Sequence, residues 1–250
     1  MTLTCRSAAS TPQKGVTAMT RISQVLLLVV WLAFIVYALF FAPGAGSGED
    51  PWLKPLLTLS AKEPSVLAMF TLLGLYPLAF ACMLLRHDDR VVPAWPFVIL
   101  SFGLGAFALL PYYILTSHTH AGSHGLRLSE GIRKAAESPV THAVLFVLTL
   151  LVMGYGLLLG DLGVYMEAFR TSHFVHVMTL DFFVLTLLSV YAIYTGSRRR
   201  WRPQAMALLG FIPVLGLILY IWMTRMDQSA SPYVPSQASV RSRRRKVGSG

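Results

Sequence analysis

The stretch FVHVMTLDFFVLTLLSVYAIYT, residues 174 to 195, shows what class of protein this chain belongs to. It contains one formally charged residue, Asp181. A helix of ~20 mainly apolar residues spans the ~30 Å hydrocarbon core of a bilayer. A helix on the surface of a soluble domain would show a polar face at the helical period, and this stretch shows none. It therefore predicts a transmembrane helix.

The composition of the whole chain agrees with that prediction. Of 250 residues, 55% are hydrophobic and 13% are charged, and the mean hydropathy is +0.60. Soluble domains carry ~25% charged residues. The alternating segments of ~10 residues that build a transmembrane barrel are absent. We predict an all-α fold, an integral membrane helical bundle of about six transmembrane helices.

Six apolar runs are separated by polar or charged segments. Trp52–Leu59 is too short to cross and is expected at the interface, and the segments 127–134 and 161–169 are expected as amphipathic surface helices. Residues 1–21 form a polar N-terminal segment and residues 225–250 a basic tail that is disordered by composition. The predicted spans are about 22–42, 65–85, 92–115, 140–160, 174–195 and 205–224.

The two ends of the sequence leave alternatives open. Residues 1–21 are rich in Ser and Thr, carry Arg6, Lys14 and Arg21, and contain no acid. This is typical of a transit peptide, of a start site placed too early with Met19 as the true beginning, or of a disordered tail. Cys5 and Cys82 lie in different environments, so we expect no disulfide between them.

The distribution of Lys and Arg does not show which side of a six-span protein faces the cytoplasmic side of the membrane. With the distal tail left out, seven Lys and Arg fall on one side and nine on the other. The net charge of +10 indicates attraction to anionic lipid headgroups. Because the basic residues lie beside spans, we expect no nucleic acid partner.

The strongest candidate site opens the fifth predicted span. His173 and His176 are three residues apart and share a helical face, and Asp181 lies further along, inside the hydrocarbon zone. An acid at that depth is costly and marks a functional-site candidate. The open roles are a proton relay, a metal or pigment ligand, or an acid acting on a substrate. The alternative is a hydrogen-bonded packing role for Asp181 and a headgroup-level position for the histidines.

Other histidines give weaker candidates. His142, near the start of the fourth predicted span, is a candidate axial ligand for haem or for the magnesium of chlorophyll, or an interfacial hydrogen-bonding residue. For the protein as a whole, a bound pigment, chlorophyll or carotenoid, is left open. His118, His120 and His124 form a His-rich tract without a nearby Cys or acid to complete a close site, so we predict no metal site there.

Small residues and absent motifs complete the pattern. Gly156 with Gly160, and Ser101 with Gly105, have the spacing that lets membrane helices approach closely, and we expect contacts within the bundle. No GxxxxGK[ST], HExxH or GxSxG motif occurs, which disfavours an ATP-driven pump, a zincin and a serine hydrolase.

Three stretches resemble an uncharacterised family of multi-pass membrane proteins of cyanobacteria and plastids. They are PAWPFVILSFGLGAFALLPYYIL (Pro93–Leu115), FVHVMTLDFFVL (Phe174–Leu185) and LGLYPLAFACMLL (Leu73–Leu85). The resemblance covers roughly residues 20–195 and does not reach the sixth predicted span or the tail. It implies a location, a thylakoid or cyanobacterial inner membrane, and no activity.

That location gives three hypotheses. The first is a non-enzymatic accessory or assembly factor that binds photosynthetic membrane complexes, with or without a pigment. The second is a membrane enzyme or carrier for an isoprenoid, pigment or lipid that uses Asp181 and His176. The third, a proton or small-ion transporter, has a single intramembrane acid in its favour.

Overall fold

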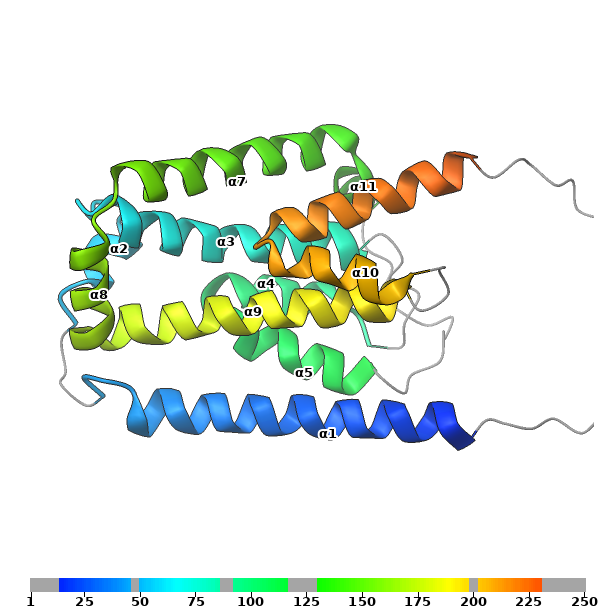
Figure 1. Ribbon diagram of the computed structural model, residues 1–250, viewed down its shortest axis with the longest axis horizontal. Helices are drawn as coiled ribbons and strands as arrows, with labels where there is room; N and C mark the ends of the chain where they lie inside the picture. The colour runs from blue at the N-terminus through cyan, green and yellow to red at the C-terminus, as the bar shows by residue number, and fades with distance from the viewer. Residues whose placement is uncertain (1–13, 46–49, 86–91, 117–129, 198–201, 231–250) are drawn as a thin grey trace, which may run out of the picture.

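Four helices are long and apolar enough to cross a membrane. The computed structural model describes residues 14–45, 50–85, 92–116, 130–197 and 202–230, and shows only helices and connecting turns there (Figure 1). Four predicted spans are confirmed as single long helices with bounds within a few residues of those expected, apart from an N-terminal extension of the first. They are α1 (Lys14–Val36), which the π-helix η1 (Tyr37–Phe41) continues, α3 (Pro64–Leu84), α7 (Pro139–Leu159) and α9 (His173–Ser197).

Three short helices lie where surface segments are expected. They are α2 (Leu53–Leu57), α6 (Glu130–Glu137) and α8 (Leu162–Thr171). The Asp161 carboxylate caps α8 by accepting from the N–H groups of Gly163 and Val164. The exposed face of α6 carries an ion pair between Lys134 and Glu130. Both amphipathic predictions are confirmed as helices.

The predicted third span is not one helix. It is divided into α4 (Trp95–Leu104) and α5 (Ala106–Thr116), and Gly105 joins them with φ 51°, a left-handed value that suits glycine. The rings of Phe97 and Tyr112 lie 5.6 Å apart. In a continuous helix these two residues would be ~22 Å apart along the axis. The chain therefore folds back at Gly105 into a helical hairpin.

The predicted sixth span is divided in the same way. It consists of α10 (Pro203–Ala207), the 3-10 helix η3 (Leu208–Phe211) and α11 (Leu215–Ala230). The turn at Ile212–Val214 brings Gly216 against the Leu209 carbonyl, where a Cβ atom would find no room. Figure 1 shows α11 returning beside α10 toward the end from which α10 came. This is a second helical hairpin.

Both hairpins open at the same end of the bundle. We call the end where η1 stops and α3 and α9 begin the Asp50 end, and the opposite end, where α9 stops, the Ser197 end (Figure 1). Tyr113 of α5 packs on Tyr191 of α9, whereas Ala106 bonds to Asp181, so α5 runs toward the Ser197 end. A Cβ on Gly196 would lie 2.7 Å from the Tyr220 hydroxyl, so α11 also runs toward that end.

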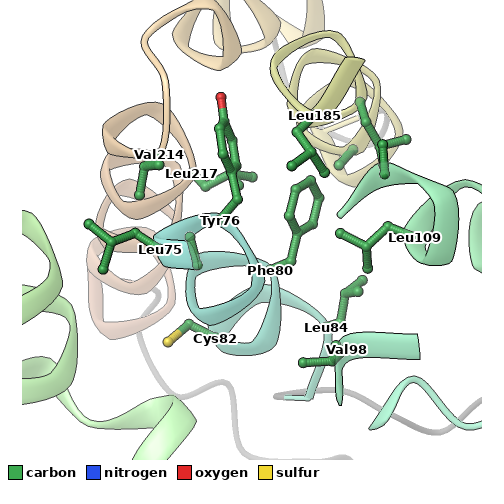
Figure 2. Packing of buried hydrophobic residues seen from close by; sticks show 14 of the residues in the cluster. Leu75, Tyr76, Phe80, Cys82, Leu84, Val98, Leu109, Leu185, Val214 and Leu217 are labelled. Carbon is green, nitrogen blue, oxygen red and sulfur yellow. The ribbon is translucent and has the colours of Figure 1, made fainter. Parts of the chain in front are cut away.

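The core is formed by α3 and α9, with the two hairpins packed against them, and α1 and α7 lie outside with most of their surface exposed. Figure 2 shows the buried side chains of Tyr76 and Phe80 between Leu217 of α11 and Leu185 of α9. The Tyr76 hydroxyl donates to Thr186 Oγ1 at 2.6 Å, because the Thr186 proton goes to the Phe182 carbonyl. The interior of the bundle is thus joined by side-chain bonds as well as by apolar packing.

The glycine pair of α7 packs within the molecule, as expected. A Cβ on Gly156 would come 2.5 Å from Ala68 Cβ, and one on Gly160 would come 2.6 Å from Ser65 Cβ. Gly105 also lies in close contact within the bundle, since a Cβ there would overlap the Asp181 side chain of α9, and it makes the turn of the first hairpin as well.

Candidate functional site

Asp181 lies in the middle of the bundle, where it is 4% exposed. Its Oδ1 accepts from the backbone N–H of Ala106 at 2.7 Å. Ala106 is the first residue of α5, so the carboxylate stands at the N-terminus of the second half of the hairpin. The Cα of Gly105 approaches so closely that any Cβ there would overlap the carboxylate.

The physical reason for this contact is the broken helix. The first N–H groups of a helix have no partner within it, and inside a bilayer no water replaces that partner. A carboxylate at a helix N-terminus satisfies a donor and also complements the helix dipole. Asp181 therefore acts as a cap for α5 at a depth where an unpaired N–H would cost several kcal/mol.

His176 is held on three sides. Its ring stacks on Phe169 of α8 at 4.2 Å and on Tyr37 of η1 at 5.8 Å. Nδ1 donates to the Phe169 carbonyl at 2.9 Å, which places the proton on Nδ1. Nε2 then accepts from the Tyr37 hydroxyl at 2.9 Å. The ring joins η1, α8 and α9 at the Asp50 end.

His173 and His142 also bond to backbone carbonyls. His173 Nε2 donates to Ala38 O at 2.8 Å. The residue that would continue the π-helix bonding to Ala38 O is Pro43, which has no N–H, so this carbonyl needs a side-chain donor. His142 is fully buried, and its Nε2 donates at 2.9 Å to Ala136 O in the last turn of α6. A pigment at His142 stays a prediction.

The four predicted site residues do not form one site. His173 and His176 come together at the Asp50 end, but Asp181 is five positions after His176 and points ~140° away around the helix. His142 belongs to α7 and contacts α6 at the Ser197 end. Within the described ranges no three His, Cys, Asp or Glu side chains meet as metal binding would require. The predictions for His118, His120 and His124 lie outside the described residues.

Two further polar side chains, which the sequence did not single out, serve the first hairpin. Pro111 lacks an N–H, so the Phe107 carbonyl four residues earlier loses its helical donor. Trp31 Nε1 of α1 donates to that oxygen at 3.0 Å. Gln24 Nε2 donates at 2.8 Å to Ile114 O, in the last turn of α5. Pro111 in the sequence indicates that the Phe107 carbonyl has no helical donor, but no local pattern identifies Trp31 as the residue that donates to it.

Asp50 is a third polar residue that the sequence did not single out, and it forms hydrogen bonds at the start of α9. Its carboxylate accepts from the Ser172 hydroxyl at 2.8 Å and from the Phe174 N–H at 2.9 Å, at the start of α9. It also accepts from the Trp52 N–H at 2.9 Å. Partial burial alone would raise the pKa of Asp50, but these hydrogen bonds to the ionised form outweigh it and hold the pKa below its usual value.

The arrangement as a whole satisfies the backbone at helix ends. Asp181 binds a helix N-terminus, and the three histidines bind carbonyls at the ends of η1, α6 and α8. Comparison with family models, with curated proteins and with solved structures gave no match, so the chemistry is interpreted from this geometry alone.

Proposed function

We propose that the chain crosses the bilayer four times and that both hairpins are re-entrant from the Ser197 end. Helix α5 has 11 residues and reaches ~16 Å, and the apolar part of α11, Leu215–Met226, reaches ~18 Å, so both are well short of the ~30 Å hydrocarbon core. The two hairpins then begin and end on one side of the membrane. This replaces a count of six spans as the topology that we favour.

The four-crossing topology also places most of the basic residues at one end of the bundle. The segments that join helices at the Asp50 end contain three Lys and Arg residues, namely Lys54, Lys62 and Arg170. The sequence segments that join helices at the Ser197 end, 85–94, 117–138 and 198–202, contain nine. By the positive-inside rule, the Ser197 end faces the compartment in which the protein is made.

Within that topology, we propose that the protein is a non-enzymatic accessory or assembly factor of a photosynthetic membrane, thylakoid or cyanobacterial inner membrane. One observation carries the non-enzymatic part: every candidate catalytic side chain bonds to a backbone group at a helix end. Such bonds fix the fold and leave no pair of candidates placed for proton transfer. The resemblance of three stretches to a cyanobacterial and plastid family supports the location.

A second candidate function rests on Asp181. Broken helices with ends near the bilayer midplane line the substrate sites of many carriers. Asp181 stands at such a break, so a carrier or enzyme for an isoprenoid, pigment or lipid is the alternative.

Asp181→Asn separates the two functions. Asn keeps an oxygen acceptor for the Ala106 N–H but has no carboxylate to move protons. A photosynthetic deletion strain complemented with this variant is compared with wild type for photosystem levels and for lipid and carotenoid profiles. The accessory role predicts reduced complexes in the deletion, unchanged profiles, and rescue by Asp181→Asn.

The opposite pattern would overturn the accessory role. A changed lipid or carotenoid profile in the deletion strain, not restored by an Asp181→Asn protein present at wild-type level in the membrane, would establish the carrier or enzyme. The absorption spectrum of the protein purified in mild detergent tests pigment binding in the same preparation.

A further inference from the structure

An apolar groove lies between α3, α7, α8 and α9. Its volume is about 240 Å³ and it is open on one side. Ala68, Leu72 and Phe182 form its buried floor, and Leu157 of α7 and Leu162 of α8 form an exposed rim. The lining is almost entirely apolar. None of the four predicted site residues lines this groove.

The groove follows the direction of a lipid chain. It begins beside Ser65, in the first turn of α3 at the Asp50 end, and reaches Leu72. Seven helical residues correspond to a depth of ~10 Å, within one leaflet of a ~30 Å core. A methylene group is about as large as a water molecule, ~30 Å³, so the groove has room for roughly eight methylene groups.

Two contacts shape the walls of the groove. Gly156 lets α7 lie directly on α3 at Ala68, since a Cβ there would come 2.5 Å from Ala68 Cβ, and this contact closes one edge of the groove. On the opposite wall the Tyr165 hydroxyl donates to Thr179 Oγ1 at 2.7 Å, because the Thr179 proton goes to the Val175 carbonyl. This bond holds the Tyr165 ring against α9 and away from the space.

The surroundings indicate what fills it. The rim continues into the outer face of α7, where Leu150, Leu151 and Leu158 are exposed. In a helix that crosses a bilayer, such a face is covered by lipid tails. Met69 and Met153 line the groove, and their flexible thioether side chains adapt to a chain of variable shape.

We propose that this groove holds one acyl chain of a membrane lipid, whose headgroup lies beside α8 at the Asp50 end. The inference rests on the chain lying in a bilayer and not on the accessory role. The bound chain would fill the space between α7 and α9 that the protein leaves open. It would make the lipid a structural part of the bundle.

The test uses the full chain in vesicles of phosphatidylcholine and phosphatidylglycerol, in which one lipid carries a photoactivatable group on its acyl chain. After illumination and digestion, mass spectrometry locates the labelled residues. We expect label on the segments that contain Met69 and Met153. Leu157→Trp, which places an indole over the opening, is expected to lower this label roughly tenfold.

Leu158→Trp is the matched control. Leu158 follows Leu157 on α7, is 84% exposed against 73% for Leu157, and does not line the groove. It is expected to leave the label unchanged. Leu162→Trp closes the rim from α8 and repeats the test if Leu157→Trp does not fold.

Two results would overturn the proposal. One is label on Met69 and Met153 no stronger than on the outer face of α1, and equal in both Trp variants, which indicates surface lipid only. The other is a photo-crosslinking amino acid at position 157 that in native membranes captures a protein and no lipid, which indicates a partner helix as the occupant.

Discussion

At the scale of single residues, Asp181 and Gly105 depend on each other. The carboxylate occupies the volume that a side chain at position 105 would need, and the glycine allows the chain to reverse at φ 51°. The polar side chains of this bundle that sequence reasoning marked for chemistry are bonded to backbone groups that broken helices leave without a partner.

Gly105→Ala is expected to destabilise the protein by about 2–3 kcal/mol, because the added Cβ meets the Asp181 carboxylate and the backbone region is one that non-glycine residues rarely adopt. Gly103→Ala is the control. No atom lies within 4 Å of a Cβ there, and alanine favours the helix. Thermal unfolding in detergent compares them; equal stability of the two variants would contradict the role of the turn.

Trp31→Phe is expected to cost about 1–3 kcal/mol, because the Phe107 carbonyl is left unpaired. Pro111→Ala restores an N–H that can reach the same carbonyl. In that background Trp31→Phe should cost much less. Unfolding free energies of the four proteins in this double-mutant cycle give the coupling, and a coupling near zero would refute the explanation.

At the scale of secondary-structure elements, the helices of the Asp50 end start with acidic caps. Glu63 accepts from the Ser65 N–H at the start of α3 and from the Asp161 N–H, and Asp161 itself caps α8. Asp50 does the same for α9 through Ser172 and Phe174. Negative side chains at helix N-termini oppose the positive end of each helix dipole.

Asp50 makes this end sensitive to acid. Its pKa is lower in the folded protein than its usual 3.8, so its contribution to stability is present above that value and is lost as pH falls through the folded pKa. We expect wild type to be more stable than Asp50→Asn at about pH 6 and the difference to shrink as the pH falls below 3.8. Tm values at several pH values check this; a constant difference would contradict it.

The first hairpin predicts a labelling pattern. Single cysteines at Trp95 and Leu115, at the start of α4 and near the end of α5, should react with a membrane-impermeant maleimide from the same side of the bilayer. Cys5 and Cys82 are replaced first. Reaction from opposite sides would show that this segment crosses the membrane.

At the scale of the whole molecule, the hairpins change the side on which later segments lie. With the five Lys and Arg of the distal tail left out in both cases, two re-entrant hairpins place 3 Lys and Arg at the Asp50 end and 13 at the Ser197 end, whereas six crossings divide the same residues 7 to 9. Topology and charge are therefore consistent only when the hairpins turn back.

Oriented vesicles test that arrangement. Lys54→Cys at the Asp50 end and Gln204→Cys at the start of α10 are both exposed positions. They should react from opposite faces, Gln204→Cys from the face where the protein is made. Labelling of both from one face would reject the orientation that we propose.

The sequence by itself determined the class of the protein and four of its long helices, because length and hydropathy are local properties that a bilayer imposes on each segment separately. It also located α8 and marked Asp181 as a residue in need of a partner. It could not show that Val92–Leu115 reverses at Gly105, since a straight and a folded apolar segment have the same composition.

Only the tertiary structure decided which groups satisfy the broken helices. Asp181 and Ala106 are 75 residues apart in sequence, Trp31 and Phe107 are 76 apart, and Tyr37 and His176 are 139 apart. No local pattern connects such pairs, because each carbonyl or N–H can be satisfied by a donor or acceptor from any neighbouring helix. The sequence shows which backbone N–H and C=O groups lack a partner within their own helix, and tertiary packing determines which residue supplies that partner.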